Sequence, residues 1–400
     1  MSIENTVSAE RLHISFFGRR NVGKSSLVNK ITGQSLSVVS DVLGTTTDPV
    51  KKSMELLPLG PVVIIDTPGF DDEGELGVLR VQKTREILTK TDIAVFVVDA
   101  SEEELSDVEK KFLAVLKNKK IPYIIAYNKC DLSTDIPILK EDSIWVSTVT
   151  GIGVEALKEK LGEIAKKNKS DKRLIADLLN EGDMVVLVTP IDESAPKGRL
   201  ILPQQQTIRD ILDAKCTSIV CQVDELKGVL ELLRKPPRMV VTDSQAFGKV
   251  AKIVPKDIPL TSFSILFARY KGDLPILVKG AAMLSKLKDG DRILIAEGCT
   301  HHRQCGDIGT VKMPIWISKF SYADIEMDFT SGGEFPENLS QYKLVVHCGG
   351  CMLNETEMKN RIITANEEGV PIVNYGVAIA HMNGILRRSL ELFPEVLELL

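Results

Sequence analysis

A phosphate-binding loop close to the amino terminus constrains the fold of this chain more than any other feature. The apolar segment 12–17 predicts a strand, and the sequence GRRNVGKS follows it at residues 18–25. In this G-x-x-x-x-G-K-S pattern the glycines let backbone N–H groups wrap phosphates, the lysine neutralises the β- and γ-phosphate oxygens, and the serine hydroxyl binds Mg²⁺. With a helix expected to begin near Ser25, the pattern predicts a nucleotide-binding α/β domain.

A second motif supplies the expected contacts to Mg²⁺ and to the γ-phosphate. The all-apolar segment 62–65 predicts a buried strand, and Asp66-Thr67-Pro68-Gly69 follows it directly. We expect Asp66 to hold the Mg²⁺ shell and the Gly69 N–H to sense the γ-phosphate. The segment 93–98 is also apolar throughout, which is typical of the strands of a parallel sheet.

Guanine specificity is expected at the end of the strand predicted at 121–127, where Asn128-Lys129-Cys130-Asp131 begins. A carboxylate at Asp131 can accept from both the N1–H and the N2 amine of guanine, a donor pair that adenine lacks. Ser147 and Thr148, after a strand at 144–146, would complete the base pocket. The predicted nucleotide-binding residues are Gly18, Asn21, Val22, Gly23, Lys24, Ser25, Ser26, Asp66, Gly69, Asn128, Lys129, Asp131, Ser147 and Thr148.

In order and spacing, these motifs resemble the TrmE and Era group of translation-factor-like GTPases over about residues 10–168. The resemblance implies that the sequence GTTTD at 44–48 is the first switch loop. Thr46 would then be an Mg²⁺ ligand beside Ser25 and Asp66, with its two threonine neighbours as competitors. A polar loop without a metal role is the alternative for the three threonines.

Two positions bear on the rate of hydrolysis. Phe70 stands where a Ras-like enzyme has its water-orienting glutamine, and a phenyl ring cannot orient water. Asn21 matches the residue with which TrmE-like proteins ligate K⁺, and K⁺ there would offset the developing phosphate charge in place of an arginine finger. A loop-capping amide is the alternative role of Asn21. We expect slow, K⁺-stimulated hydrolysis that depends on Lys24, Asn21, Thr46 and Gly69.

The last part of the chain carries a different chemistry. Cys299-Thr300-His301 and His347-Cys348-Gly349-Gly350-Cys351 each follow a predicted strand, at 292–296 and 343–346. Ligands bind at the carboxyl ends of strands in an open α/β sheet. Thiolates with nearby imidazoles select a soft metal, unlike the oxygen ligands of an Mg²⁺ site. A helix predicted at 355–368 would place its N-terminus, which favours negative charge, beside the Cys-x-x-Cys pair.

Three metal or thiol chemistries fit these cysteine motifs. A [4Fe–4S] cluster usually takes four thiolates, so three would leave one iron for His301, His347, a carboxylate, water or a guest ligand. A structural zinc site could close with three cysteines and one histidine, and the pair Cys348 and Cys351 could act alone as a redox couple. His302 is expected either to lie beside the metal ligands without binding the metal or to face solvent, and Cys305 is expected to be a spare thiol.

Length and patterning predict three domains. The chain has 400 residues, which is too many for one ordinary core. We expect an α/β GTPase domain over residues 1–168, with a mostly parallel sheet and helices on both faces. Alternating strands and helices predict a small α/β dimerisation or interaction domain over 169–263. An α/β cluster-binding domain over 264–400 would follow, with a last helix at 377–392.

A GTPase domain followed by Cys-x-His and His-Cys-x-x-Cys resembles HydF, the family of [FeFe]-hydrogenase maturation GTPases, over the whole chain. Residues 195–200 also resemble the middle domain of this family. The resemblance implies a scaffold that receives a dinuclear iron precursor made with two radical-SAM maturases and delivers it to the hydrogenase apoprotein. It implies homodimers formed through the middle domain, and a [4Fe–4S] cluster on Cys299, Cys348 and Cys351, with His301 and His347 as the motif histidines.

Composition bears on location and on rival functions. Residues 1–11 are polar and no apolar run is long enough to span a bilayer, so we expect a cytoplasmic protein without membrane contact. The net charge of −5 and the pI near 5.7 argue against broad nucleic-acid binding. One rival function is a GTPase of tRNA modification or ribosome assembly with a structural zinc. Another is a redox-responsive GTPase whose cluster gates hydrolysis.

Overall fold

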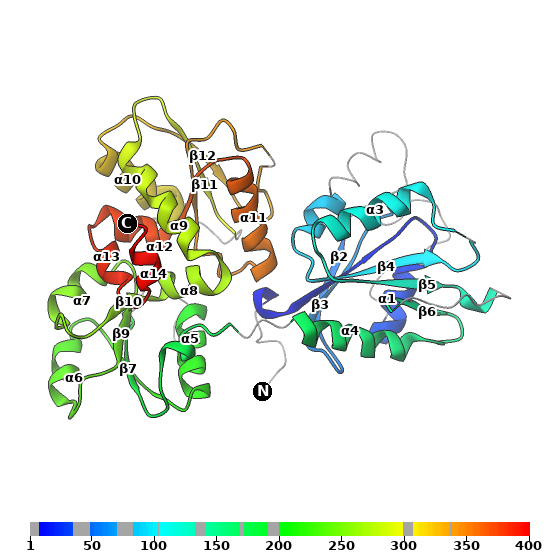
Figure 1. The fold of residues 1–400 in the computed structure, drawn as a ribbon, viewed down its shortest axis with the longest axis horizontal. Coiled ribbons are helices and arrows are strands. Elements are labelled where there is room, and N and C mark those ends of the chain that lie inside the picture. Colours follow the sequence, from blue (N-terminus) through cyan, green and yellow to red (C-terminus); the bar gives the residue numbers. More distant parts are fainter. Residues whose placement is uncertain are drawn as a thin grey trace. The chain divides into compact units, whose positions relative to one another are not determined.

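The computed structural model describes residues 8–34, 49–69, 83–102, 104–132, 141–168, 172–190, 200–298, 307–336 and 338–400. The chain forms two compact units, Met1–Ser170 and Asp171–Leu400. Figure 1 labels most of their helices and strands. Each unit has its own sheets and its own buried side chains.

The N-terminal unit is built on a six-stranded sheet in the order β2-β3-β1-β4-β5-β6. All neighbours pair in parallel except β2, which runs antiparallel to β3. The central strands are buried on both faces, which explains why their sequences are continuous apolar runs. The strands are β1 (Leu12–Phe17), β2 (Val50–Leu56), β3 (Gly60–Asp66), β4 (Ile93–Asp99), β5 (Tyr123–Asn128) and β6 (Ser143–Trp145).

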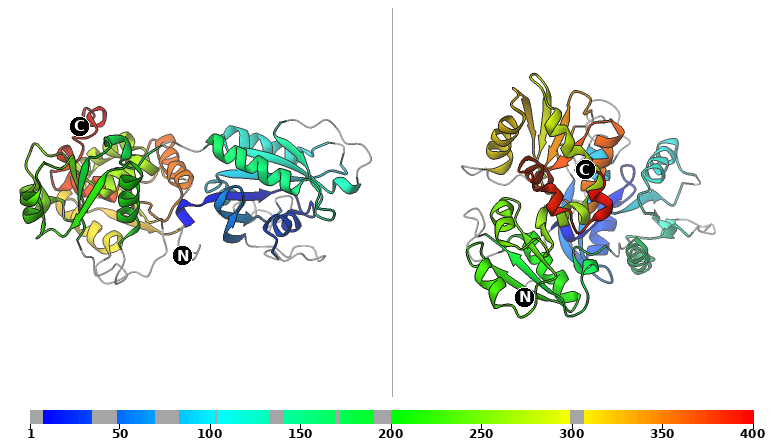
Figure 2. Two further views of the ribbon diagram at one scale, coloured as in Figure 1. Left: turned by 90° about the horizontal axis from the view of Figure 1, so that it is seen from below. Right: turned by 60° about the vertical axis from the view of Figure 1, so that its left-hand side comes forward.

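Helices cover both faces of this sheet, as the two views in Figure 2 show. Helices α1 (Lys24–Thr32) and α4 (Val154–Asn168) pack against the face that carries Phe16. Helix α3 (Asp107–Asn118) packs against the opposite face, where the ring centroids of Phe17 and Phe112 are 5.1 Å apart. Successive side chains of a strand point to opposite faces, so two adjacent phenylalanines serve two different cores.

The parallel pairing brings the loops of this unit to one edge of the sheet. Phe16 lies opposite Asp66 across β1 and β3, and Asp99 lies opposite Asn128 across β4 and β5. Five strands therefore end side by side, and the segments that follow them share that edge. The phosphate loop, the Asp66–Gly69 motif and the Asn128–Asp131 motif belong to these segments, whereas the predicted switch loop at 44–48 lies outside the described residues.

The C-terminal unit contains two four-stranded sheets, and all pairs in both are parallel. The first has the order β10-β9-β7-β8 and consists of β7 (Met184–Val188), β8 (Thr217–Cys221), β9 (Met239–Thr242) and β10 (Leu260–Ser262). The second has the order β12-β11-β13-β14 and consists of β11 (Arg292–Ala296), β12 (Glu326–Thr330), β13 (Leu344–His347) and β14 (Ile372–Asn374).

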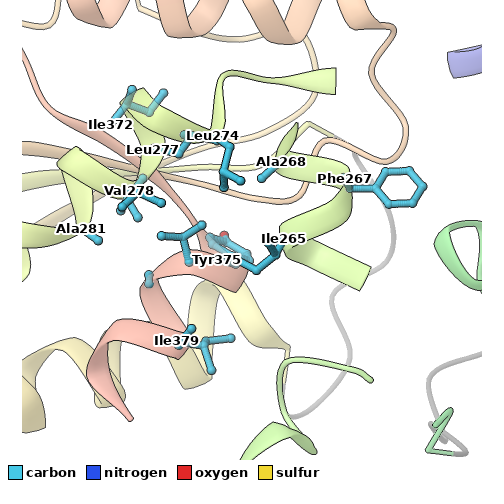
Figure 3. Close-up of a cluster of buried hydrophobic side chains, with 14 of the residues drawn as sticks. Ile265, Phe267, Ala268, Leu274, Leu277, Val278, Ala281, Ile372, Tyr375 and Ile379 are labelled. Carbon is cyan, nitrogen blue, oxygen red and sulfur yellow. The ribbon is translucent and has the colours of Figure 1, made fainter. Parts of the chain in front are cut away.

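One buried core connects these two sheets. Figure 3 shows Val278 and Ala281 in this core together with Tyr375 and Ile379. The helix that contains Gly280 packs closely against β14, because a Cβ on Gly280 would lie 2.0 Å from the carbonyl oxygen of Ile372. The core helices are α8 (Phe263–Lys271), α9 (Leu274–Ala281) and α12 (Tyr375–Met382); the other helices of eight or more residues are α5 (Leu202–Asp213), α10 (Met313–Ser321) and α11 (Glu355–Glu367).

Four shorter helices complete the described part of this unit. They are α6 (Leu226–Leu232), α7 (Phe247–Ile253), α13 (Leu386–Ser389) and α14 (Pro394–Leu397). A single helix over 377–392 is wrong: α12 ends at Met382, and Gly384 adopts a left-handed φ of 67° before α13 begins. The division into a second and a third domain at residue 263 stays a prediction, because one core serves both sheets.

The helices described are short. The longest, α4, has 15 residues, whereas about 20 apolar residues are needed to cross a bilayer. Within the described ranges, no helix combines the length and the apolar character that a membrane span requires.

Candidate functional site

The phosphate loop between β1 and α1 has a backbone that only small residues can adopt. Gly18 and Gly23 have φ values of 154° and 88°. A Cβ on Gly18 would lie 2.2 Å from the carbonyl oxygen of Val97, and a Cβ on Gly23 would lie 2.2 Å from Nδ2 of Asn128. The two glycines are therefore required by conformation and by close approach.

The Lys24 side chain folds back over this loop. Its Nζ donates to the carbonyl oxygens of Gly18 at 2.9 Å and Arg19 at 2.5 Å. The ammonium group is thus held where the loop would cradle the phosphates of a nucleotide. Asn21 is exposed and has a left-handed φ of 59°, a conformation that asparagine tolerates better than most residues.

Two of the three predicted Mg²⁺ ligands meet at the edge of the sheet. The Ser25 hydroxyl at the start of α1 donates to Oδ2 of Asp66 at 2.6 Å. The Asp66 carboxylate is buried at the end of β3 and is followed by the buried Gly69. A hydroxyl and a carboxylate are the hard oxygen donors that Mg²⁺ prefers, so these residues fit the ion. Thr46, the third predicted ligand, and Phe70 lie outside the described residues.

The buried Asn128 joins the phosphate loop to the predicted base pocket. Its Nδ2 donates to the carbonyl oxygen of Val22 at 2.9 Å, and its Oδ1 accepts from the N–H of Thr148 at 3.3 Å. In the loop that follows β6, the carbonyl oxygen of Ser147 accepts from the N–H of Gly151, and its Oγ accepts from the N–H of Thr150. Two motifs far apart in the sequence are therefore held together by one amide side chain.

The other residues of the guanine motif differ in exposure, since Cys130 is buried, Lys129 is half-buried and Asp131 is exposed. Asp131 is exposed in a short 3₁₀ helix, Cys130–Leu132, where its carboxylate is accessible to a base. Lys129 has a left-handed φ of 65°, and its Nζ donates to Oδ2 of Asp99 at 2.5 Å. Burial alone would raise the pKa of Asp99, but hydrogen bonds from Lys129 and Ser101 outweigh it and lower that pKa.

The structure adds one ion pair to this site that the motifs do not indicate. Arg19, the second residue of the phosphate loop, donates to the buried Glu109 at 3.0 Å and also bonds Glu102. Hydrogen bonds to Glu102 and Glu109 raise the pKa of Arg19. Because Glu109 also accepts from Ser106 in the capping box of α3, the phosphate loop is tied to the N-terminus of that helix.

The second candidate site is the segment Cys348–Leu353, which we call the sulfur loop. It follows β13 and precedes α11. The Cys348 N–H donates to the carbonyl oxygen of Ala296 at the end of β11, and its Sγ accepts from the N–H groups of Gly298 at 3.0 Å and Gly350 at 3.4 Å. Burial raises the pKa of the Cys348 thiol to about 11, against the effect of these two donors.

His347 has both ring nitrogens engaged. It is fully buried; Nδ1 lies 2.7 Å from the carbonyl oxygen of Cys348, and Nε2 lies 3.0 Å from Nη1 of Arg361. An arginine only donates, so Nε2 accepts and Nδ1 carries the proton. Burial lowers the pKa of His347 to about 3, and the charge of Arg361 acts in the same direction. His347 remains a candidate ligand, but binding iron through Nε2 would require the Arg361 contact to break.

Two buried cations support the sulfur loop. Arg361 on α11 is 4% exposed and also donates to Glu357 at 2.9 Å. Lys271, the last residue of α8, is 3% exposed, and its Nζ donates to the carbonyl oxygens of Cys351 at 3.2 Å and Leu353 at 3.0 Å. Burial raises the pKa of the Cys351 thiol, and the positive charge of Lys271 opposes that rise.

A buried carboxylate lies at the same edge. Glu297 follows β11 directly, and the Tyr375 hydroxyl at the start of α12 donates to its Oε1 at 3.5 Å. Burial and then the negative charges of Cys348 and Glu297 raise the pKa of Tyr375. Sequence motifs signal neither residue, although Glu297 stands two positions before Cys299.

The predicted partners of these cysteines cannot be placed. Cys299, His301, His302 and Cys305 lie outside the described residues. In the part of the chain that the structure describes, no group of three His, Cys, Asp or Glu side chains is arranged to hold a metal ion. The sulfur loop nevertheless supplies two thiols, and Gly350 within it and Gly298 after β11 donate N–H bonds to the Cys348 sulfur. This donor set fits an iron–sulfur cluster.

Family models match three consecutive parts of the chain. Residues 13–129 match the model described as a 50S ribosome-binding GTPase. Residues 174–272 match the hydrogen maturase F dimerization domain, and residues 275–392 match the hydrogen maturase F tetramerization domain. The last two together cover more than half of the chain. The N-terminal unit is thus a GTPase domain, in agreement with its motifs.

Relatives share the GTPase character. The chain is 32% identical over 157 residues to the tRNA modification GTPase MnmE of Thiobacillus denitrificans, covering 39% of this chain and 34% of that protein. It is 30% identical over 217 residues to GTPase Der of Mycoplasmopsis pulmonis, covering 50% of this chain and 49% of that protein. The chain therefore spans half or less of the length of these relatives.

Among solved structures, Aquifex aeolicus Era bound to GDP and AlF4⁻ is 18% identical and has a TM-score of 0.35, covering 52% of this chain and 93% of that chain. A probable GTP-binding protein engB is 25% identical with a TM-score of 0.32, covering 39% of this chain and 100% of that chain. Scores this low carry no functional argument.

Proposed function

This chain belongs to the hydrogen maturase F (HydF) family, and from that premise we propose that it is a GTP-hydrolysing scaffold for [FeFe]-hydrogenase maturation. In this proposal it binds a [4Fe–4S] cluster, receives a dinuclear iron precursor and delivers it to the hydrogenase. The observation that supports it is the presence, in one chain, of a formed Ser25–Asp66 oxygen pair and a sulfur loop with two N–H donors to Cys348.

The nucleotide site would act through its own residues as follows. Lys24 places a positive charge against the phosphates, and Ser25 and Asp66 hold Mg²⁺, with Thr46 as the proposed third ligand. Bound Mg²⁺ would offset the charge that develops on the transferred phosphoryl group. The Gly69 N–H is placed after Asp66 to respond to the γ-phosphate, and this contact would couple the nucleotide state to the switch loops.

We propose that hydrolysis is slow and stimulated by K⁺. The exposed, left-handed Asn21 presents its amide from the phosphate loop, where a carbonyl oxygen can ligate a monovalent cation. Arg19, by contrast, is bound to Glu102 and Glu109 and so is directed toward α3. Asn21 would then be the residue through which the loop recruits a monovalent cation.

The cluster would be held by Cys348 and Cys351 of the sulfur loop together with Cys299. When bound, it would supply one-electron chemistry and an iron with an exchangeable ligand position, to which a precursor could attach. The N–H groups of Gly298 and Gly350 donate to the Cys348 sulfur and would reduce the negative charge density on that sulfur when it binds iron. His301 and His347 remain candidate further ligands, and Glu297 is a buried carboxylate in the same region.

The three-domain division and the partners follow from the family. We propose a GTPase domain over 1–168, a dimerisation domain over 169–263 and a cluster-binding domain over 264–400, in a cytoplasmic homodimer. The partners would be the radical-SAM maturases and the hydrogenase apoprotein. GTP or GDP would set the switch loops at 44–48 and 69–77 and so decide which partner docks, which requires a partner affinity that differs between nucleotide states.

A second candidate is favoured by the match of residues 13–129 to a 50S ribosome-binding GTPase and by the identity to MnmE. In that case the chain would act in tRNA modification or ribosome assembly, and three cysteines with one histidine would hold a structural zinc. Tight RNA binding that weakens steeply with salt would support this candidate. The net charge of −5 weighs against it.

A transfer assay tests the proposed function. The full chain, loaded by co-expression with the radical-SAM maturases, is incubated with hydrogenase apoprotein, and hydrogen evolution is measured. We expect activation by the wild type and none by Cys348→Ser, while Cys221→Ser, a buried thiol on β8 in the other sheet, activates normally. Equal activation by Cys348→Ser and the wild type would refute a carrier role for the sulfur loop.

A further inference from the structure

The phosphate loop contacts a buried carboxylate that lies outside the GTPase motifs predicted from the sequence. Glu109, the third residue of α3, is 1% exposed. Its Oε1 accepts from Nε of Arg19 at 3.0 Å, and its Oε2 accepts from the N–H and the Oγ of Ser106, both at 2.8 Å. Three donors therefore fix this carboxylate at the start of α3, where the helix N-terminus also favours negative charge.

Arg19 connects this carboxylate to the lysine of the phosphate loop. Its side chain is 23% exposed and bonds both Glu109 and Glu102. Its carbonyl oxygen accepts from Nζ of Lys24 at 2.5 Å, and Lys24 also donates to the carbonyl oxygen of Gly18 at 2.9 Å. A shift of Arg19 would consequently move one of the oxygen atoms that hold the Lys24 ammonium group.

The two carboxylates that bond Arg19 differ in their exposure. A guanidinium group is planar and presents its N–H donors in fixed directions, so it can bond two carboxylates at once. Glu109 is buried, whereas the side chain of Glu102 is 45% exposed, so solvent screens the pair with Glu102 more than the pair with Glu109. Glu109 is therefore the partner that we expect to hold Arg19 in place.

We propose that Glu109 is a positioning residue of the GTPase site, which acts through Arg19 to hold the phosphate loop in the shape in which Lys24 meets the nucleotide. Lys24 would contact the phosphates in the bound substrate and in the transition state alike. Loss of its position should weaken the binding of both to the same degree, which raises KM and leaves kcat unchanged. The inference goes beyond the proposed function and concerns GTP hydrolysis alone, so it does not depend on the cluster.

The test is steady-state GTP hydrolysis by the full chain, in which KM and kcat are measured for the wild type, Glu109→Gln, Arg19→Gln and the double variant. Glutamine keeps the size of glutamate and removes the charge that pairs with Arg19. The control is Phe112→Leu, which loosens the packing of the same helix against Phe17 and leaves the Arg19–Glu109 pair in place. Thermal unfolding is followed for every variant.

We expect Glu109→Gln and Arg19→Gln each to raise KM for GTP about tenfold, the effect of one lost hydrogen bond between charged groups, with kcat within about twofold of the wild type. The double variant should have the same KM as either single variant, because the two residues act as one unit. Phe112→Leu should unfold at a lower temperature and keep the wild-type KM.

A wild-type KM in Glu109→Gln would overturn the inference, and so would single-variant effects that add up in the double variant. A fall in KM would overturn it too, because Glu109 would then keep Arg19 away from the phosphates. An equal rise of KM in Phe112→Leu would show that the packing of α3 decides, and would also contradict the proposal. If Glu109→Gln does not fold, the KM of Arg19→Gln decides by the same criteria.

Discussion

The nucleotide site and the sulfur loop both lie at the carboxyl ends of parallel strands, yet different parts of the chain hold them in place. The phosphate loop is shaped by its own backbone, through the positive φ of Gly18 and Gly23 and the bonds of Lys24 to neighbouring carbonyl oxygens. The buried Lys271 of α8 donates to the sulfur loop, and the buried Arg361 of α11 donates to His347, which directly precedes the loop.

The difference suits what each site is proposed to bind. A nucleotide with Mg²⁺ arrives from water and leaves again, so an open loop with charged and hydroxyl groups suits it. A cluster stays, carries negative charge and needs its sulfurs shielded, so buried donors and buried positive charge suit it. Backbone conformation therefore shapes the phosphate loop itself, whereas residues of other helices and strands hold the sulfur loop.

The largest expected effect breaks the support of the sulfur loop. Arg361→Met removes the guanidinium that donates to Glu357 and His347, and breaking a buried pair in this way costs about 3–5 kcal/mol. We expect chemical denaturation to show earlier unfolding of the C-terminal unit. Lys359→Met is the control, since an exposed pair contributes about 0–1 kcal/mol. The same midpoint for both variants would mean that the buried network does not support the loop.

The next effect breaks the nucleotide site and leaves the sulfur loop intact. Ser25→Ala removes the hydroxyl that meets Asp66, so Mg²⁺ loses a ligand. We expect kcat/KM for GTP to fall about 100-fold, in the range found when one group that stabilises a transition state is removed. Iron uptake should not change. Ser53→Ala on the exposed edge strand β2 is the control. If Ser25→Ala hydrolysed GTP as fast as Ser53→Ala, the proposed Mg²⁺ role of Ser25 would be excluded.

A smaller effect is expected when the amide of Asn21 is removed and the backbone of the phosphate loop is kept. Asn21→Gly keeps the left-handed conformation at no steric cost and removes only the amide. We expect wild-type hydrolysis to be about tenfold faster in KCl than in NaCl, as for a cation that replaces an arginine finger. The variant should show no difference between the salts. A wild type with equal rates in both salts would contradict K⁺ stimulation.

The smallest effect concerns the ion pair of Asp99 and Lys129. The folded-state pKa of Asp99 is lowered, so its contribution to stability is present above the ordinary carboxylate pKa of about 3.9 and is lost as the pH falls through the lowered value. We expect Asp99→Asn to reduce the loss of stability between pH 6 and pH 3 by less than about 1 kcal/mol. A steeper acid dependence in the variant would show that this sign is wrong.

The sequence predicts the strands and the helix around the proposed nucleotide site well, because short motifs follow apolar runs there. The strand at 12–17 has these bounds in the structure, and α1 begins at Lys24, one residue from the expected start. Asn128 was expected to contact the nucleotide, and the structure gives it a second role as the link between Val22 and Thr148. The apolar runs predict a parallel sheet, and parallel pairing brings the ends of its strands, and so Asn128 and its two partners, to one edge.

The support of the sulfur loop could not be predicted in the same way. The strands before both cysteine motifs were expected, and β11 and β13 confirm them. Lys271 and Cys351, however, are 80 positions apart, and no spacing rule connects them. Arg361 follows Glu357 by one helical turn, a pattern that ordinarily indicates a solvent-exposed pair, whereas here both are buried.

The helix predicted at 377–392 shows a further limit. The apolar pattern continues across the end of α12 into α13, because both helices contribute to the same core. Only Gly384, with its left-handed φ, marks the end of the first helix. The spacing of apolar residues predicts which side chains are buried, but Gly384 determines where the helix ends.

The central claim is that a GTPase and an iron–sulfur cluster share this chain. The most direct test is anaerobic purification of the full chain, followed by metal analysis and EPR of the reduced protein. It compares the wild type with Cys348→Ser and with Cys221→Ser. We predict about four irons per chain and a [4Fe–4S]⁺ signal, both lost in Cys348→Ser and kept in Cys221→Ser. One zinc per chain without iron would contradict the claim and favour the RNA-associated GTPase instead.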